Sequence, residues 1–291
     1  MSEERIREIL EAFETVGSYR REEVQAAMEL KEQITPFLIE IVETVASNPS
    51  EYADRPGYFA HMYAIMLLGH FREPRSHEAI VKLAGLPNGL AKELLGDTIT
   101  EDLRTILYRT CGESLESIKS LALSEDADEY SRGAALDAMV FAVAEGMVSR
   151  EEVVSFFSAI LDHLNDSDSK SLVWSQLADA ACDLYPEELM EKLKDAYDKG
   201  LIDSWTVSYE DQEEALEGSV DASLESVRKK LERRSLDDLH KRMSWWACFK
   251  PGREALAYET DVEKSHRKKS KKTEKTKRKT AKASRKKNRR P

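Results

Sequence analysis

Apolar residues recur at the spacing of an α-helix along most of this chain, and this feature constrains the fold more than any other. The runs that begin at Ile6 and at Phe37 repeat at intervals of three or four residues, which places their apolar side chains on one helical face. No stretch shows the strict alternation that is typical of a half-buried β-strand. Since 41% of the 291 residues are hydrophobic, the chain can build a substantial core. We therefore expect an all-α protein.

The predicted helices come in pairs at a regular period. The first helices begin near Gly57, Asp97, Tyr130 and Ser169, and the second helices begin near Arg75, Ser114, Ser149 and Pro186. The first helices are offset by 40, 33 and 39 residues. This period is typical of HEAT-like α-solenoids, in which antiparallel helix pairs bury their apolar faces by stacking on their neighbours. A compact all-α bundle is the alternative fold.

The chain divides into a helical domain and a tail. We expect a HEAT-like helical repeat domain over residues 1–255, with N-terminal helices in 1–46, the clearest repeats in 57–201 and C-terminal helices in 208–249. The tail, residues 264–291, contains no Leu, Ile, Val or aromatic residue. Burial therefore cannot offset the entropy lost on ordering it, and we expect the tail to be disordered when free.

The basic tail and the rest of the chain carry opposite charges. The tail holds 16 Lys or Arg and one acidic residue, a net charge of +15, whereas the other 263 residues hold 28 basic and 54 acidic residues, a net charge of −26. Lys and Arg neutralise phosphates whatever the base sequence, and the tail has no aromatic residue to stack on bases. We expect it to make nonspecific contact with RNA, DNA or the ribosome, or with the acidic body of its own chain. The candidate nucleic-acid-binding residues are Lys268, Lys269, Lys271, Lys272, Lys277, Arg278, Lys279, Arg285, Lys286, Lys287, Arg289 and Arg290.

The sequence contains no recognisable catalytic motif. There is no Gly-rich nucleotide loop, Walker A loop, serine-hydrolase elbow or zinc-protease helix. The three cysteines are widely spaced, and the histidines at 61, 70 and 77 have no Cys beside them to complete a zinc site. We therefore predict no catalytic, cofactor-binding or metal-binding residues and no cofactor, and we expect a binding protein rather than an enzyme.

Two segments are candidates for binding a protein partner. Met243–Phe249 concentrates three aromatic residues, and Trp is enriched at binding hot spots. Because adjacent helical residues point about 100° apart, we expect one of its two Trp residues to be structural. The stretch Tyr209–Glu217 has five carboxylates and no cation. The candidate partner-binding residues are Trp245, Trp246, Phe249, Glu210, Asp211, Glu213 and Glu214.

The sequence also bears on location. No uninterrupted apolar stretch approaches the roughly 18 residues that a membrane helix needs. The N-terminus lacks the basic region and apolar segment of a secretory signal. We expect a cytoplasmic protein that makes no contact with a membrane.

Helix pairs followed by Met-Ser-Trp-Trp-Ala-Cys-Phe at 243–249 resemble a bacterial family of uncharacterised function with HEAT-like folds. The resemblance spans roughly residues 1–255 and implies the fold, but no activity. Members of that family often carry a C-terminal SEC-C zinc motif, of the type found at the end of the SecA translocation motor. No Cys follows Cys248 in this chain, so the motif is absent and the basic tail occupies its place.

Together these features favour a non-catalytic protein-interaction scaffold whose basic tail adds electrostatic contact with nucleic acid or the ribosome. The alternative is an enzyme or small-molecule binder that uses the concave face of the solenoid. A pocket lined by converging ionisable groups would favour the alternative. A shallow acidic groove would favour the scaffold.

Overall fold

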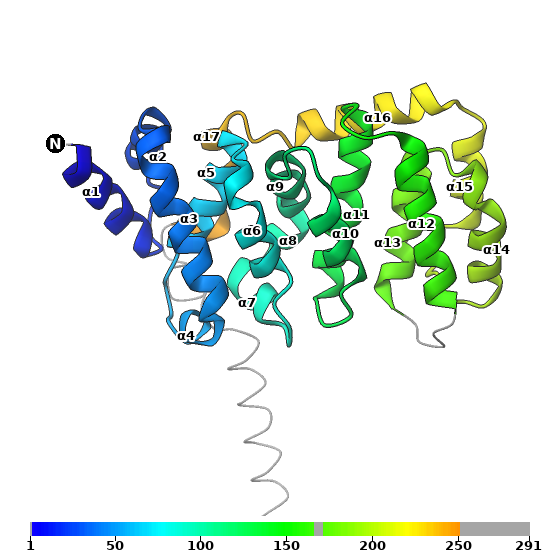
Figure 1. The fold of residues 1–291 in the computed structure, drawn as a ribbon, viewed down its shortest axis with the longest axis horizontal. Coiled ribbons are helices and arrows are strands. Elements are labelled where there is room, and N and C mark those ends of the chain that lie inside the picture. The colour runs from blue at the N-terminus through cyan, green and yellow to red at the C-terminus, as the bar shows by residue number, and fades with distance from the viewer. Residues whose placement is uncertain (1, 166–170, 251–291) are drawn as a thin grey trace, which may run out of the picture. The chain divides into compact units, whose positions relative to one another are not determined.

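The computed structural model describes residues 2–165 and 171–250, and the regular elements in that part of the chain are helices (Figure 1). The prediction of an all-α protein is therefore confirmed. Within the described ranges, β pairing is limited to one isolated bridge between Thr15 and Tyr58. The basic tail lies outside the described residues, so its disorder stays a prediction.

The first part of the chain folds into α1 (Ser2–Glu14), α2 (Arg21–Glu29), α3 (Lys31–Ser47), α4 (Pro49–Ala53), α5 (Ala60–Phe71), the 3-10 helix η1 (Pro74–Ser76) and α6 (His77–Ala84). The middle part contains α7 (Leu90–Leu95), α8 (Thr98–Glu101), α9 (Leu103–Thr110), α10 (Glu116–Leu123), α11 (Glu129–Ala144) and α12 (Arg150–Asn165). The last part contains α13 (Leu172–Asp183), η2 (Glu187–Leu189), α14 (Met190–Asp198), α15 (Tyr209–Leu216), α16 (Val220–Arg233), α17 (Leu239–Met243) and η3 (Ala247–Phe249).

Two compact units can be distinguished. Residues up to Thr15 and from Tyr19 to Trp245 form the first, and among the described residues Val16–Ser18 group with 246–250 in the second. In the first unit, α5, α9, α11, α13 and α15 contact one another in succession. The helices α6, α10, α12 and α14 pack beside this row, and each contacts at least one helix that lies near it in sequence.

The core of the first unit is centred on α5 and α11. Almost every residue of both helices is buried, as expected for helices that are covered on all sides. Helix α11 contacts α9, α10, α13 and α16, and its many Ala residues allow close packing. A Cβ at Gly133 would lie 2.4 Å from the side-chain amide of Gln176. The absence of a side chain at this position therefore lets α13 approach α11.

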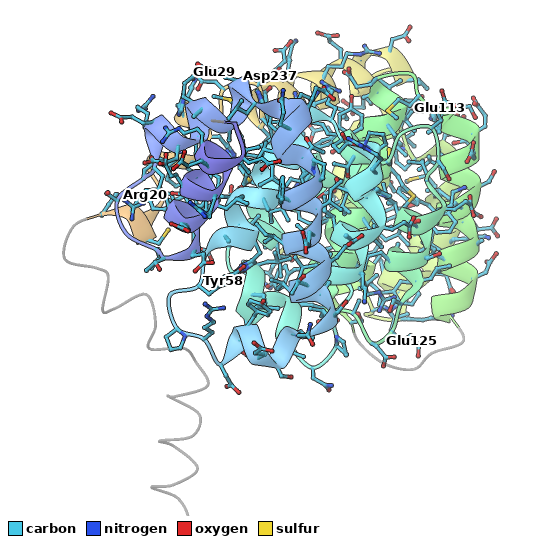
Figure 2. All side chains as sticks on the ribbon, turned by 60° about the vertical axis from the view of Figure 1, so that its left-hand side comes forward. Arg20, Glu29, Tyr58, Glu113, Glu125 and Asp237 are labelled. Carbon is cyan, nitrogen blue, oxygen red and sulfur yellow. The ribbon has the colours of Figure 1, made fainter. Side chains whose placement is uncertain are left out.

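Residues 220–243, which we term the return segment, run back along the row. Helix α16 packs on α11 and α13, and α17 packs on α5. Leu236, Leu239 and Met243 are buried, and the Nδ1 atom of His240 lies 2.9 Å from the hydroxyl of Tyr19. Figure 2 shows Asp237 of the return segment at one end of the helices, whereas Glu125, in the loop before α11, lies at the other. The return segment thus joins the last helices of the unit to the first.

Candidate functional site

A cavity of about 470 Å³ lies between the return segment and helices α8, α9, α11 and α13. Val140 and Phe141 contribute apolar surface, and the other lining residues are charged. The acidic ones are Glu101, Asp137, Asp179 and Asp183, and the basic ones are Arg104, Lys230, Arg233, Arg234 and Arg242. This volume falls in the range of small-molecule sites, but a lining so rich in charge requires a polar ligand or a structural role.

Helical spacing brings these side chains together. On α11, Asp137 is followed at three and four residues by Val140 and Phe141, so the three share one face. On α13, Asp179 and Asp183 are four residues apart and also share a face. The cations of α16 follow the same spacing. Each wall of the cavity is therefore one face of one helix.

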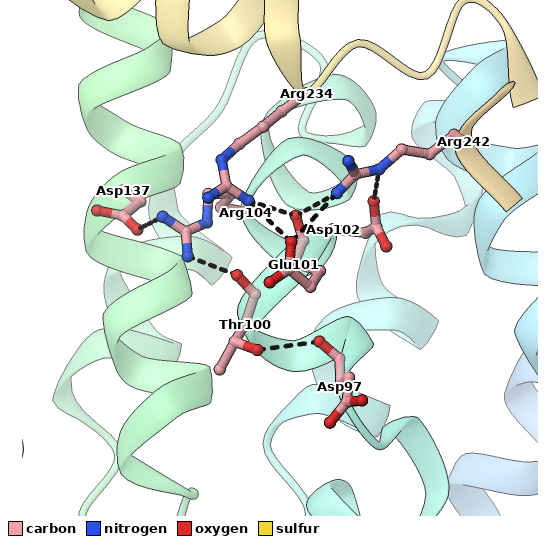
Figure 3. Close-up of polar contacts among 8 residues, drawn as sticks. All are labelled: Asp97, Thr100, Glu101, Asp102, Arg104, Asp137, Arg234 and Arg242. Atoms are coloured by element: carbon pink, nitrogen blue, oxygen red, sulfur yellow. Dashed lines mark hydrogen bonds and ion pairs between the residues drawn. The ribbon is translucent and has the colours of Figure 1, made fainter. Parts of the chain in front are cut away.

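At one end of the cavity, guanidinium groups converge on the carboxyl end of α8 (Figure 3). The Nη1 atom of Arg234 donates to the carbonyl of Glu101 at 2.9 Å, and Nη2 of Arg242 donates to the same carbonyl at 2.9 Å. Arg242 is also paired with the buried carboxylate of Asp102. The pKa of Arg234 is lowered by burial and by the charge of Arg104. Positive charge is thus concentrated at this end.

At the other end, three carboxylates lie close together. Nη1 of Arg104 is 2.5 Å from Oδ2 of Asp137, and Nζ of Lys230 lies 2.6 and 2.8 Å from the two oxygens of Asp183. Burial raises the pKa of Asp137 to about 6, although Arg104 opposes the shift. The pKa of Asp179 is raised by partial burial and by the charge of Asp183. Negative charge is thus concentrated here.

Some of these charges hold the return segment in place. Lys230, Arg234 and Arg242 belong to the return segment and pair with acidic residues of α13 and α8 or with the residue after α8. Asp179 and Arg233 have no such role. Among the described residues, Asp179 makes no ion pair or hydrogen bond, and the only hydrogen bond of Arg233 runs from Nε to the carbonyl of Lys229 in its own helix. These two charges remain available to a ligand.

A second feature is Trp205, whose surface is 98% exposed. It lies on a hydrogen-bonded turn between α14 and α15. Its backbone N–H donates to Oδ1 of Asp203 at 3.1 Å, and the N–H of Asp203 donates to Oγ of Ser175 at 2.9 Å. A large apolar side chain is therefore held in solvent by an ordered turn. Sequence reasoning missed Trp205, because its only signal was a position outside the helical periodicity.

The segment of the chain that contains Trp205 is acidic. Residues 190–217 contain nine acidic and three basic residues. Each of the three Lys side chains is already bound to an Asp. The pairs are Lys192–Asp162, Lys194–Asp198 and Lys199–Asp195. The remaining carboxylates leave this surface, which we term the Trp205 surface, with excess negative charge.

The acidic candidates from the sequence lie on α15 in this surface. Glu210, Glu213 and Glu214 are exposed. Asp211 is exposed too, but it caps its helix: its Oδ2 accepts hydrogen bonds from the N–H and the hydroxyl of Ser208 at 2.7 and 2.8 Å. These bonds lower the pKa of Asp211. Its role in the fold is therefore evident, whereas the three Glu side chains make no ion pair with described residues.

The aromatic candidates divide between the two compact units. Trp245 ends the first unit and is 55% exposed. In the second unit, the ring of Trp246 stacks on that of Phe249, with centroids 5.8 Å apart and planes 4° from parallel. All the nucleic-acid-binding candidates, from Lys268 to Arg290, lie outside the described residues.

Described histidines make hydrogen bonds within the fold. His61 donates from Nε2 to the carbonyl of Leu94 at 2.7 Å, and burial lowers its pKa to about 4. His70 donates to the carbonyl of Leu236 at 2.8 Å. Over residues 2–165 and 171–250, no three His, Cys, Asp or Glu side chains are grouped to hold a metal ion. In the same ranges, every helix is too short or too polar to cross a membrane.

Comparison with known proteins assigns the chain to a family. Residues 4–250 match the family model described as "Protein of unknown function (DUF1186)". A Chlamydia trachomatis protein is 34% identical over 212 residues, which cover 72% of this chain and 84% of the relative. A Chlamydia muridarum protein is 32% identical over 231 residues, which cover 79% and 91% respectively. Both relatives are described as uncharacterized proteins, and no solved structure matches significantly. The resemblance noted in the sequence is therefore confirmed, and the chain belongs to the DUF1186 family.

Proposed function

We propose that this protein is a non-catalytic, cytoplasmic interaction scaffold, a HEAT-like α-solenoid that binds a basic segment of a protein partner at the Trp205 surface. The observation that carries this proposal is the 98% exposure of Trp205 on an ordered turn. The succession of contacts from α5 to α15 supports the solenoid arrangement.

The chemistry of the surface selects the partner. Exposed Trp is the best aromatic acceptor for the cation of a Lys or Arg side chain, with a contribution of about 0.5–1 kcal/mol that increases on desolvation. Glu210, Glu213 and Glu214, which form no ion pair with the part of the chain that the structure describes, attract the same cations. A basic segment with an arginine or lysine over the indole ring would satisfy both features, whereas an acidic segment would be repelled.

Calorimetric titration tests this proposal. The ligand is a synthetic peptide with the basic sequence of residues 277–290, and the protein ends at Glu263 so that its own tail does not compete. We expect Trp205→Ala to weaken binding by tenfold or more, as for a hot-spot residue. Tyr130→Ala, which removes another exposed aromatic side chain, is the matched control and should leave binding unchanged. Equal affinity for a Glu-rich peptide of the same length, or unchanged binding by Trp205→Ala, would refute the proposal.

The basic tail is the second part of this proposal. With 16 cations in 28 residues, it supplies nonspecific electrostatic contact with RNA, DNA or the ribosome. In the absence of nucleic acid, it makes an intramolecular contact with the acidic body. For the full-length chain, log affinity for single-stranded RNA should fall with log salt by about 0.7 per phosphate neutralised. If the chain that ends at Glu263 binds RNA as tightly as the full-length chain, this role of the tail is excluded.

The alternative function, binding of a small molecule, is favoured by one observation. The 470 Å³ cavity brings ionisable groups from six helices together, which is the feature expected of such a site rather than of a shallow acidic groove.

A further inference from the structure

The cavity under the return segment is electrically dipolar. Three guanidinium groups and two carboxylates stand at the α8 end. They belong to Arg233, Arg234 and Arg242, and to Glu101 and Asp102. Two carboxylates and one ammonium group stand at the α13 end. They belong to Asp179 and Asp183, and to Lys230. The ion pair of Arg104 with Asp137 lies between the two ends and is neutral. The formal charges are therefore +1 at one end and −1 at the other.

The positive end has donors that the protein does not use. Among the described residues, Nε and Nη2 of Arg234 have no acceptor, and neither do Nη1 and Nη2 of Arg233. These two residues are neighbours at the end of α16, so their guanidinium groups approach the cavity from different directions. A planar carboxylate can be satisfied by one guanidinium fork, whereas a tetrahedral phosphate accepts donors from several directions. A phosphate monoester also carries about two negative charges near neutral pH, so this end attracts it.

The negative end has a carboxylate that the protein does not use. Asp179 is exposed within the cavity and makes no ion pair or hydrogen bond with any described residue. Asp137 is paired with Arg104 through Oδ2, and its Oδ1 has no donor among the described residues. Asp137 and Asp183 are already paired with Arg104 and Lys230, so Asp179 is the carboxylate that lacks a cation. A primary ammonium group supplies both the charge and three hydrogen-bond donors.

We infer that the cavity binds a small phosphate monoester that also carries a primary amine, with the phosphate at Arg233 and Arg234 and the amine at Asp179. The negative phosphate of the ligand then faces the cations of the cavity, and its positive amine faces the carboxylates. An aminosugar phosphate has both groups on one ring and a size that suits 470 Å³. This inference deepens the small-molecule alternative and does not depend on the Trp205 surface, since the peptide titration and the test below use different residues and ligands.

Three matched probes test it on the full-length chain by calorimetric titration. Glucosamine 6-phosphate has both groups, glucose 6-phosphate lacks the amine, and glucosamine lacks the phosphate. We expect the first to bind about 10- to 100-fold more tightly than either of the others, the usual effect of a lost charge-assisted hydrogen bond. Inorganic phosphate is the fourth probe. If it binds as tightly as glucosamine 6-phosphate, or if no phosphate ester binds, the inference is wrong.

Substitutions test which residues of the cavity bind the phosphate and which bind the amine. Arg234→Gln and Arg233→Gln should each weaken glucosamine 6-phosphate binding by about tenfold or more. Lys229→Gln is the matched control, because it removes one charge from the same helix without lining the cavity. Asp179→Asn should reduce the affinity for glucosamine 6-phosphate to that for glucose 6-phosphate, and should not weaken the latter. Arg233 makes no ion pair or hydrogen bond with another described helix, so Arg233→Gln should fold normally. It therefore tests the phosphate site even if Arg234→Gln fails to fold. Equal effects of Lys229→Gln and Arg233→Gln would overturn the assignment.

Discussion

In the ion pair between Arg109 and Asp237, replacing the exposed partner should cost more stability than replacing the buried one. Arg109 lies on α9 with its side chain only 3% exposed, and it pairs with Asp237 of the return segment, whose side chain is 75% exposed. Nε and Nη1 of Arg109 are buried with no hydrogen-bond partner among the described residues. Asp237 is therefore the counter-charge for a guanidinium group that is otherwise poorly solvated.

Two substitutions separate the charge from its partner. Asp237→Asn leaves a buried cation without a counter-charge and should lower the free energy of unfolding by about 1.5–3 kcal/mol. Arg109→Met keeps most of the buried volume, removes the desolvated charge and returns Asp237 to water, so it should cost less than about 1 kcal/mol. Changing the exposed partner should therefore be more harmful than changing the buried one.

Urea denaturation followed by Trp fluorescence measures both effects, and melting temperature gives a second readout. For a folded body of this size, Asp237→Asn should lower the melting temperature by roughly 3–12 °C. The double variant should lie within about 0.5 kcal/mol of Arg109→Met in its free energy of unfolding, because the asparagine side chain then faces no buried charge. A larger loss for Arg109→Met than for Asp237→Asn would show that the pair stabilises the fold by attraction and not by relief of desolvation.

Three further predictions concern neighbouring features. Leu236→Ala should cost about 2–5 kcal/mol in urea denaturation, since Leu236 is fully buried in the return segment, and a cost below about 1 kcal/mol would contradict its anchoring role. Trp205→Ala should change the free energy of unfolding by less than about 0.5 kcal/mol, because its side chain packs on almost nothing, and a large loss of stability would argue for a structural role. Asp137 should titrate near pH 6 by NMR, and Arg104→Gln should raise that midpoint. Because the unfolded chain releases this proton near pH 3.9, the contribution of Asp137 to stability should fall as pH rises from about 4 to 6, and the opposite slope would refute the shift.

Local structure was largely predictable from the sequence. Predicted helix starts near Asp97, Tyr130 and Ser149 lie within a residue or so of the observed starts of α8, α11 and α12. These starts depend on apolar spacing and on caps, which act over one or two helical turns. The sequence did not reveal that the helix predicted near Asp97 is interrupted at Asp102, because the partner of that carboxylate, Arg242, is 140 residues away.

The cavity could not be predicted for the same reason. Most of its charged residues, taken on their own helices, have the spacing of an ordinary solvated face. Asp137 is the exception, because it is the one acidic side chain on an otherwise buried stretch of α11. Its partner Arg104 comes from α9 and its acidic neighbours come from α13, so no local pattern reveals them. Trp205 shows the opposite limit: an aromatic residue in a loop suggests burial, and its exposure depends on how α14 and α15 are joined.

The return segment also has a consequence for the order of folding. Rows of helices that contact mainly their neighbours have low contact order and can form from either end. Here His240 contacts Tyr19 across 221 residues, so the return segment adds contacts of high sequence separation that stacking between neighbours lacks. During synthesis, α5, α9 and α11 emerge long before residue 243, and the faces that the return segment covers stay open to solvent until then. Closure makes the helices at the two ends of the row unfold together rather than fray independently, and a chain that stops before Val220 lacks both this cooperativity and the last wall of the cavity.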